Sequence, residues 1–355
     1  MGATAARNRE LDTALRHCAR SALGAEVERL EEIPGQLGLR RFVRVHLAGG
    51  EPRTAIARVE APEDPAGRPA DAPPEPPLEP VRALLEACGL PVPKRLGSDT
   101  AAGIELLEDL GDQSLTRAAA AADTELRRAL YAEACDLVPR LQRVSDPGGV
   151  AAFRRHLDPA LFAYKADLFA RWSLAERDRE TGAAEREVVR TAFAEIAAGA
   201  RAAPQRLAHR DFQSSNLMVR PGRAAGERLA MIDLQGALLA PPEYDLVCLL
   251  RDSYVELGDA EVSGAIERIR PALPDAPDPD EFAQRFDLLT LTRKGKDHAR
   301  FLYAAHERGN TRYLRTLPAT VRALRAAARR AAERESRWAA LAELIEELPE
   351  TACAR

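Results

Sequence analysis

The stretch that decides the fold is residues 208–219, which read AHRDFQSSNLMV, together with residues 229–235, which read LAMIDLQ. Four residues separate Asp211 from Asn216 in the order H-R-D-x-x-x-x-N, and Asp233 ends an apolar run further along the chain. A loop aspartate, an asparagine and a strand-terminal aspartate in this order are typical of a phosphoryl-transfer centre.

The chemistry of phosphoryl transfer explains these residue types. The reaction depends on in-line positioning, so one carboxylate must orient the acceptor hydroxyl and accept its proton late, and Asp211 is the candidate. Magnesium prefers hard oxygen ligands, usually one or two from the protein. The amide oxygen of Asn216 and the carboxylate of Asp233 would supply them. We therefore expect a catalytic Asp211 and a Mg²⁺ site at Asn216 and Asp233.

The residues around the motif predict a β-hairpin. Two apolar runs, 217–219 and 229–232, flank a turn at 220–226 that is rich in Pro and Gly. An isolated H-R-D triplet would have little weight, because a salt-bridged loop without catalysis could contain it. The ordered appearance of Asn216, the strand, the turn and Asp233 favours the catalytic interpretation.

Composition limits the classes of protein to consider. At 355 residues, with 46% hydrophobic and 30% charged residues, the chain can form two domains or one large bilobal domain. A net charge of −4 argues against a nucleic-acid partner, and an aromatic content of 5% argues against a base-stacking surface. No apolar run approaches the length of a membrane span, so we expect no membrane partner either.

The cysteines and the first residues favour a reduced, cytoplasmic enzyme. The N-terminus lacks the apolar core of a signal peptide. The cysteines are scattered without a C-x-x-C pair, which argues against a disulfide framework or a zinc site. They are Cys18, Cys88, Cys135, Cys248 and Cys353.

The N-terminal third predicts one helix and a hairpin. Residues 8–31 have apolar residues at helical spacing, and strands follow at 41–47 and 54–59 around a Gly-Gly turn. The loop at 33–41 could cover phosphates through its backbone N–H groups. Because it lacks a G-x-G-x-x-G pattern, an ordinary hairpin is an equally good interpretation.

The remaining segments read as a proline-rich loop followed by mostly helical chain. The many prolines of residues 61–80 exclude a helix there. A helix at 81–88 and a strand at 103–107 come next. A kinase-like hinge would follow, with the backbone near Glu108 and Leu110 against adenine. We expect helices over 114–203 and from 242 to the end, with the arginines of 322–337 on a solvated face.

The motifs resemble those of the aminoglycoside phosphotransferase and choline kinase-like superfamily. Its catalytic loop reads H-x-D-x-x-x-x-N, its metal motif is I-D rather than D-F-G, and Tyr244-Asp245-Leu246 follows as in that family. The resemblance implies an α+β, bilobal protein-kinase-like fold, with a β-rich N-lobe at 1–107 and a mostly helical C-lobe at 108–355. It also implies ATP and Mg²⁺ as cofactors. His209 and Asp245 would support the catalytic loop structurally.

Several segments look more specifically like the anomeric kinases of cell-wall recycling, which phosphorylate N-acetylmuramate and N-acetylglucosamine at C1. The similar segments spread over roughly residues 35 to 320 and lie at 39–45, 103–112, 209–218, 232–237, 244–252 and 313–318. This resemblance implies a small sugar as the substrate. We expect a monomer.

Two departures from the family pattern affect the site. No lysine occupies the second N-lobe strand, where Arg58 is the nearest cation and shares a strand face with Glu60. Gln213 stands where these sugar kinases often have His. Arg58 is therefore the candidate for nucleotide phosphate, and Gln213 a candidate for substrate.

Other candidate substrate contacts have structural alternatives. They are Gln235, Arg251, Lys294 and Lys296. Arg251 could contact sugar or pair along a helix with Asp252. The two lysines could form a cationic rim for a carboxylated sugar or simply a polar helix end. A kinase for aminoglycosides or choline is the alternative enzyme, and a nucleotide-binding pseudokinase scaffold is the alternative from another class.

Overall fold

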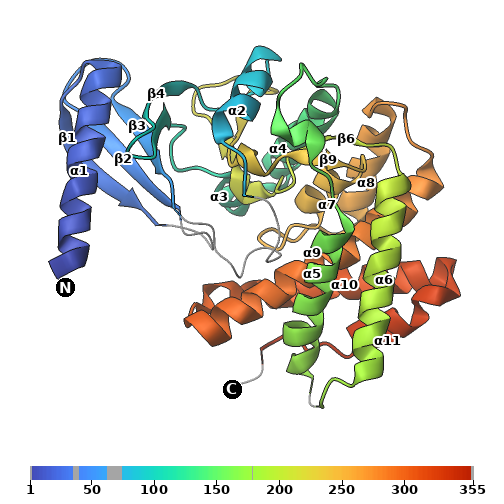
Figure 1. The fold of residues 1–355 in the computed structure, drawn as a ribbon. Coiled ribbons are helices and arrows are strands. Elements are labelled where there is room, and N and C mark those ends of the chain that lie inside the picture. Colours follow the sequence, from blue (N-terminus) through green and yellow to red (C-terminus); the bar gives the residue numbers. More distant parts are fainter. Residues whose placement is uncertain (1, 35–39, 62–73, 178, 353–355) are drawn as a thin grey trace. The chain divides into compact units, whose positions relative to one another are not determined.

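The computed structural model describes residues 2–34, 40–61, 74–177 and 179–352, in two compact units. The first unit contains residues 1–75 and 91–112, and the second contains residues 76–90 and 113–355. The division expected from the sequence, after residue 107, differs mainly in leaving 76–90 with the N-lobe. Figure 1 colours both units along the sequence.

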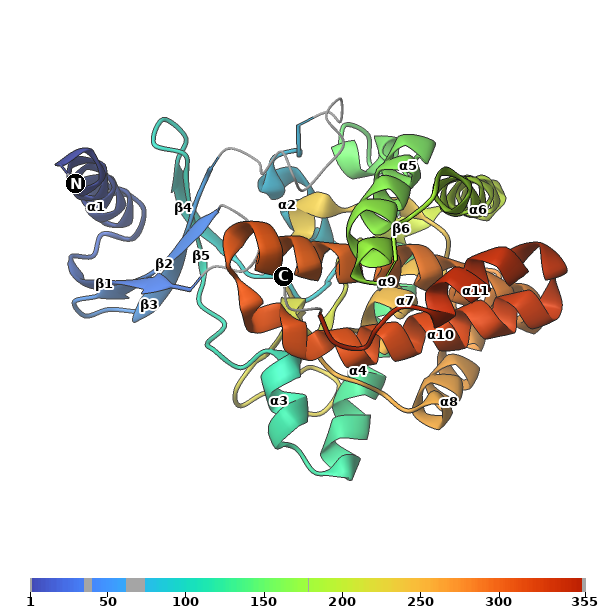
Figure 2. The same ribbon diagram turned by 90° about the horizontal axis from the view of Figure 1, so that it is seen from below.

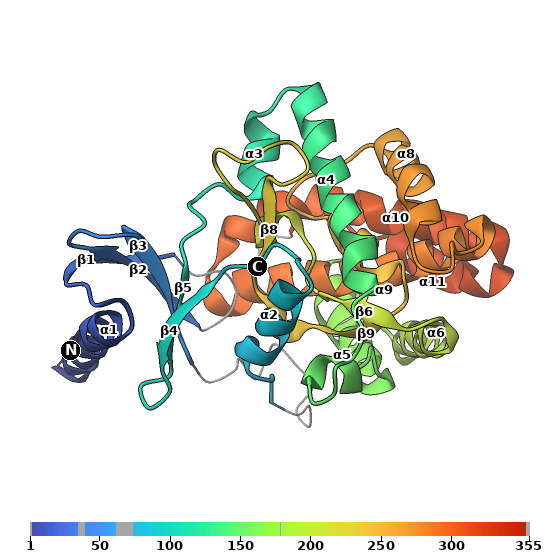
Figure 3. The same ribbon diagram turned by 90° about the horizontal axis from the view of Figure 1, so that it is seen from above.

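The first unit is a five-stranded antiparallel sheet with one helix. Its strand order is β1-β2-β3-β5-β4, and α1 (Gly2–Leu23) lies along one face of the sheet (Figure 1, Figure 3). The strands are β1 (Val27–Ile33), β2 (Arg41–Leu47), β3 (Thr54–Val59), β4 (Arg95–Asp99) and β5 (Ile104–Glu108). Alternate residues of β2, β3 and β5 pack against α1 and form this unit's core. The predicted bounds of β2 and β3 are confirmed.

The predicted helix over residues 8–31 is wrong in its last part. The helix α1 ends at Leu23, because Gly24 takes a left-handed conformation (φ +64°) that suits a helix C-terminus. The chain then forms β1, in which Arg29 pairs with His46 and Leu30 with Val45 of β2. Backbone pairing with a neighbouring strand therefore overrides the helical spacing of the apolar residues.

The proline-rich segment contains the start of a helix, which the sequence analysis excluded. The helix α2 (Leu78–Ala87) begins before the predicted residue 81 and includes Pro80 in its first turn. Proline is tolerated there because first-turn N–H groups need no intrahelical acceptor. Residues 62–73 lie outside the described residues. So do residues 35–39, which contain most of the loop predicted to cover phosphates.

The second unit is mostly helical, as expected for 114–203 and for the chain after 242. It contains α2 and the helices α3 (Leu115–Ala121), α4 (Thr124–Gln142), α5 (Pro159–Leu168), α6 (Ala183–Ala202), α7 (Tyr244–Leu250), α8 (Asp259–Ile269), α9 (Pro279–Arg308), α10 (Leu317–Arg334) and α11 (Ala339–Glu346). In the described part of the chain, no helix is long and apolar enough to span a membrane.

Two small antiparallel sheets position the residues predicted to be catalytic. The predicted hairpin is present as β7 (Leu217–Val219) paired with β8 (Leu229–Met231). A second pair, β6 (Arg206–Ala208) with β9 (Leu238–Ala240), was not predicted, because runs of three residues give little periodicity. The chain between β6 and β7 therefore leaves one short sheet and enters the other.

The long helix α9 is the centre of the second unit. It packs against α5, α6, α7 and α10, and α10 runs beside it (Figure 2). Its N-terminus is capped by Asp278 and it ends before Gly309. Residues 293–297 lie in its middle and are mostly buried, so the expectation of a polar helix end at these residues is wrong. These polar residues are buried because neighbouring helices pack over this part of α9.

Candidate catalytic centre

The turn after β6 is held by a buried carboxylate. Asp245, near the start of α7, accepts hydrogen bonds from the backbone N–H groups of His209 (2.7 Å) and Arg210 (3.1 Å). Arg210 has a left-handed backbone (φ 77°), which is unfavourable for a residue other than glycine. Burial raises the pKa of Asp245 to about 6, although the two N–H donors and His209 oppose this shift. Asp245 thus holds the backbone of the loop at His209 and Arg210.

His209 ties the same loop to the end of β8. Its Nε2 lies 2.8 Å from the carbonyl oxygen of Ile232, and its ring meets Phe212 edge to face. The side chain is buried. This contact places Asp233, the next residue, at a set distance from the catalytic loop. His209 therefore serves the geometry of the site, and its ring is directed at protein atoms.

Asp211 presents a charged carboxylate at the end of this loop. Its Oδ1 accepts a hydrogen bond from Nη1 of Arg293 (2.7 Å), and its Oδ2 lies 3.6 Å from Nε of Arg210. Burial alone would raise the pKa of Asp211, but the charges of Arg293, Arg210 and Lys296 overcome burial and hold it well below its usual value. The side chain is 27% exposed. Asp211 is thus an ionised acceptor with a weak affinity for protons.

Asn216 and Asp233 offer oxygen atoms of the kind that Mg²⁺ prefers. Asn216 donates through Nδ2 to the carbonyl oxygen of Asp211 (2.9 Å), which fixes the amide and leaves its oxygen available. A backbone hydrogen bond from Ile232 to Asn216 (3.0 Å) joins the two ligand-bearing segments.

Asp233 is held without a cation. Its Oδ1 accepts from Nε2 of Gln235 (2.6 Å), and within the described residues it forms no ion pair. Its backbone is left-handed (φ 66°), a strained conformation that is often found at functional sites. No cluster of three or more His, Cys, Asp or Glu side chains exists in the described ranges. A site with one carboxylate and one amide suits Mg²⁺, which keeps water and phosphate oxygens as further ligands.

Arg293 of α9 is a site residue that the sequence analysis missed. Beyond its bond to Asp211, its Nη2 donates to Oε1 of Gln213 (3.1 Å) and its Nη1 to the carbonyl oxygen of Arg210 (3.1 Å). It therefore fixes the predicted base and a predicted substrate residue together. The only local signal was the basic run at 293–296, which gave no reason to prefer Arg293 over the two lysines.

Asp252 and Arg251 have structural partners. Asp252 is buried, and its Oδ2 accepts from the backbone N–H (2.8 Å) and the hydroxyl (2.5 Å) of Ser214. It thus braces the loop between Asp211 and Asn216. Nη2 of Arg251 pairs with Asp259 at the start of α8 (2.9 Å), so the two neighbours do not pair with each other.

The two lysines of α9 differ in exposure. Lys294 is buried, with Nζ 2.6 Å from Asp297 and 2.9 Å from the hydroxyl of Ser253. The side chain of Lys296 is 21% exposed, and its Nζ lies 3.2 Å from Asp297. Of the rim predicted at these positions, only Lys296 reaches the surface.

The candidate nucleotide residues lie in the first unit. Arg58 projects from the sheet face opposite α1 and forms ion pairs with Glu60 and Glu105. The shared face of Arg58 and Glu60 is therefore as predicted from strand alternation. Glu108 is tied to β4, because its backbone N–H donates to Lys94 and its carboxylate accepts from the N–H of Lys94. Leu110 is buried.

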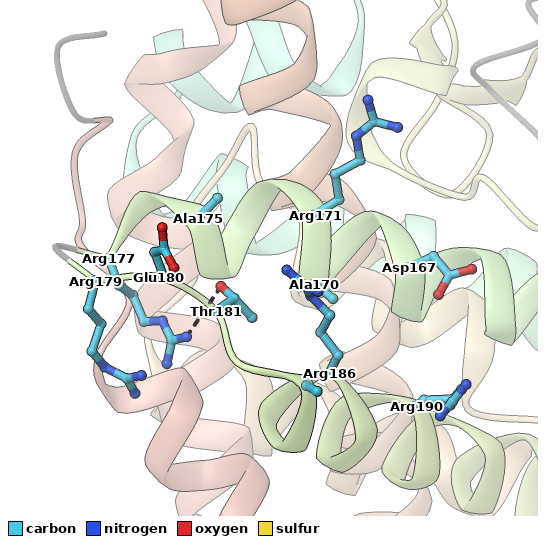
Figure 4. Close-up of a pocket in the computed structure, with 11 residues that line it drawn as sticks. Asp167, Ala170, Arg171, Ala175, Arg177, Arg179, Glu180, Thr181, Arg186 and Arg190 are labelled. Atoms are coloured by element: carbon cyan, nitrogen blue, oxygen red, sulfur yellow. Dashed lines mark hydrogen bonds between the residues drawn. The ribbon is translucent and has the colours of Figure 1, made fainter.

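A separate pocket of about 950 Å³ lies between α5 and α6 in the second unit (Figure 4). Its lining is rich in arginine: Arg171, Arg177, Arg179, Arg186 and Arg190. Arg177 and Arg179 both pair with Glu185 and Glu347. None of the catalytic-loop residues lines this pocket, so it is distinct from the centre described above.

Comparison with known proteins identifies relatives over most of the chain. The model of the phosphotransferase enzyme family matches residues 30–284. The N-acetylmuramate/N-acetylglucosamine kinase of Pseudomonas aeruginosa is 29% identical over 293 residues, covering 78% of this chain and 79% of that protein. The enzyme of the same name from Neisseria meningitidis is 31% identical over 261 residues, covering 72% and 75%.

Solved structures agree on the fold. A choline kinase from Streptococcus pneumoniae superposes with a TM-score of 0.57 at 15% identity, covering 91% of this chain and 99% of its own. A gentamicin complex of an aminoglycoside phosphotransferase gives a TM-score of 0.58 at 14% identity, covering 89% and 97%. The predicted bilobal protein-kinase-like fold is confirmed.

Proposed function

The chain belongs to the phosphotransferase enzyme family, as an ATP-dependent kinase of small molecules, and we propose that its acceptor is the C1 hydroxyl of N-acetylmuramate or N-acetylglucosamine. The names of the curated relatives support this substrate class. We further expect a cytoplasmic monomer that acts in cell-wall recycling.

In this proposal Asp211 orients the acceptor hydroxyl and accepts its proton. The observation that carries the proposal is the ionised carboxylate of Asp211, fixed by Arg293 at 2.7 Å beside Asn216 and Asp233. A carboxylate with a low pKa is a weak base, so it suits late proton transfer in a loose transition state. An anomeric hydroxyl is more acidic than an ordinary alcohol, and it therefore makes a smaller demand on that base.

The residues present fit one magnesium ion with ATP. Asn216 and Asp233 would hold it, and the ion would supply positive charge to offset the negative charge of the phosphate. Asp233 supplies a carboxylate that forms no ion pair with the described residues, while Asn216 is kept oriented by the carbonyl oxygen of Asp211. Arg58 and the backbone near Glu108 and Leu110 remain the predicted nucleotide contacts, and Gln213 and Gln235 the predicted sugar contacts.

The test is a coupled assay of ADP release with Mg-ATP and a panel of sugars. Both free amino sugars should be phosphorylated, and their methyl glycosides, in which the C1 oxygen is blocked, should not. Equal turnover of a sugar and its methyl glycoside would eliminate C1 as the acceptor. Turnover of an aminoglycoside or choline alone would support the alternative enzyme. ATP binding without turnover of any hydroxyl acceptor would indicate a scaffold.

A further inference from the structure

A buried lysine beside the catalytic loop has no polar partner. Lys165 of α5 is 2% exposed, and its Nζ makes no hydrogen bond or ion pair within the described residues. The amine lies over two aromatic rings, 4.7 Å from the centroid of Phe162 and 5.7 Å from that of Tyr244. Aromatic faces attract a cation but provide no hydrogen-bond acceptor of ordinary strength. Three donors of a protonated Lys165 would therefore go unmet.

The charges that face Lys165 are mostly of its own sign. Burial is the main cause that lowers its pKa to about 7, followed by Lys296 and Arg293 of α9, with Arg210 of the catalytic loop adding to the effect. An ionised Cys248 on α7 would raise the pKa of Lys165. Burial raises the pKa of that thiol to about 12, so it is neutral. Tyr244 is likewise neutral, because burial raises its pKa above the usual value.

Among the side chains whose charge acts most strongly on Lys165, cations outnumber acidic groups. Asp211 pairs with Arg293, and Asp297 is shared among Arg293, Lys294 and Lys296. Among the described residues, no carboxylate lies within ion-pairing distance of the Lys165 amine. A ligand with a negative group would balance the charge, whereas a cationic acceptor would add to the excess.

We propose that Lys165 binds the carboxylate of an acidic amino sugar and thereby selects it over the neutral sugar. The inference rests on the proposed function, since the carboxylate that distinguishes N-acetylmuramate from N-acetylglucosamine is the group to be read. Lys296 is partly exposed, and its positive charge acts on Lys165, so it would attract the same carboxylate. The four-carbon stem of a lysine allows its amine to move toward an incoming carboxylate. Lys294 is excluded from this role because Asp297 and Ser253 already occupy its donors.

The first test compares two substitutions of equally buried lysines. Lys165→Met keeps the length and apolar contacts of the stem, and should raise the KM for N-acetylmuramate roughly 10-fold or more, the scale of a lost hydrogen bond to a charged group. It should change the KM for N-acetylglucosamine less than 2-fold. Lys294→Met is the matched control and should affect both sugars equally. Equal changes for the two sugars in Lys165→Met would overturn the proposal.

The second test measures proton uptake on binding, first in wild type and then in Lys165→Met. At pH 8 the amine of Lys165 is mostly neutral, and a bound carboxylate should raise its pKa and draw in a proton. Calorimetric titration in the presence of ADP, in two buffers of different ionisation enthalpy, should show proton uptake with N-acetylmuramate and none with N-acetylglucosamine. Lys165→Met should abolish the uptake, which separates Lys165 from Lys296.

The outcomes distinguish this inference from the function on which it rests. Binding of both sugars with the same proton uptake, or uptake that persists in Lys165→Met, would overturn the carboxylate site alone. Binding and turnover of neither sugar would overturn the proposed function and the carboxylate site with it.

Discussion

Lys165 and Lys294 are equally buried, each 2% exposed, yet their surroundings are opposite in character. Lys294 donates to a carboxylate and a hydroxyl, whereas Lys165 lies over two aromatic rings. A buried charge that is paired and hydrogen-bonded is part of the scaffold, and its loss leaves the partner unmatched. A buried amine without partners has no such role, so Lys165 should either bind a ligand with a negative group or lose its proton.

The same contrast appears in the N-terminal unit. Arg44 pairs with Asp109 and Asp112, each at 2.7 Å, and Arg58 pairs with Glu60 and Glu105. These cations form ion pairs with carboxylates of their own sheet and the segment that follows it. We therefore expect the effect of a substitution to depend on its surroundings. Breaking a buried ion pair should cost the most and breaking a surface ion pair the least, with changes to the proposed site between them.

The largest effect should come from breaking the pairs of Lys294. Asp297→Ala leaves Lys294 with an uncompensated charge in the interior and removes one of the two carboxylates that pair with Arg293, so it should destabilise the protein by about 3–5 kcal/mol. Urea unfolding followed by circular dichroism measures this change. Burial would raise the pKa of Asp297, but Arg293, Lys294 and Lys296 hold it below the usual value, so its contribution is present at neutral pH and lost in acid. A loss below 1 kcal/mol would remove the distinction between the two lysines.

Asp211→Asn should act on the reaction. It removes the proton acceptor and the charge that pairs with Arg293, so kcat should fall by about 10²-fold or more. Binding of Mg-ATP should stay nearly unchanged, because the proposed metal ligands Asn216 and Asp233 remain. Steady-state kinetics with nucleotide titration by fluorescence separates the two effects. A variant with normal kcat would exclude Asp211 as the base.

Lys165→Met should stabilise the protein by roughly 1–4 kcal/mol near pH 6, because it removes a charge that burial disfavours. The pKa of Lys165 falls from 10.5 to about 7 on folding, so the unfolded chain binds more protons between these values. The stability that wild type has above pH 10.5 is lost as pH falls toward 7, and the advantage of the variant should grow over the same range. Thermal unfolding from pH 6 to 10 measures this slope. A destabilised variant would show that Lys165 has a partner after all.

Asp233→Ala should weaken binding of Mg-ATP about 10-fold, because it removes the carboxylate ligand of the metal. It differs from the aspartates above in that no cation within the described residues pairs with it, so protein stability should change little. Nucleotide titration at several Mg²⁺ concentrations gives the measurement. Wild-type affinity at low Mg²⁺ would make the metal assignment wrong.

The smallest effect should come from a surface pair. Arg322 of α10 forms ion pairs with Glu256 (2.7 Å) and Glu350 (2.9 Å), and its side chain is largely exposed. Arg322→Ala should cost less than about 1 kcal/mol, and less still at high salt. Urea unfolding at two salt concentrations measures it. A loss of stability as large as that of Asp297→Ala would mean that burial does not determine how much an ion pair contributes to stability.

The sequence by itself determined the fold family and the order of the candidate catalytic residues along the chain. Asp211, Asn216 and Asp233 are readable because the spacing that brings them together is local, within one loop and one hairpin. The strands at 41–47 and 54–59 were found at their observed bounds, since both have clear alternation and a Gly-Gly turn between them. Most of the strand at 27–33 was mistaken for helix because its apolar residues lie three apart, which is a helical spacing, and only pairing with β2 makes it a strand.

Only the tertiary structure decided which cations serve the site. Arg293 reaches Asp211 across 82 positions of sequence, and Lys294, its neighbour, turns instead to Ser253 and Asp297. Lys165 has no signal in its own segment at all. Its isolation arises from the rings of Phe162 and Tyr244 and from the cations of α9, which come together through helix packing. The protonation state and the ion-pair partners of a side chain depend on its burial and on residues distant in sequence, and a linear motif gives no information on either.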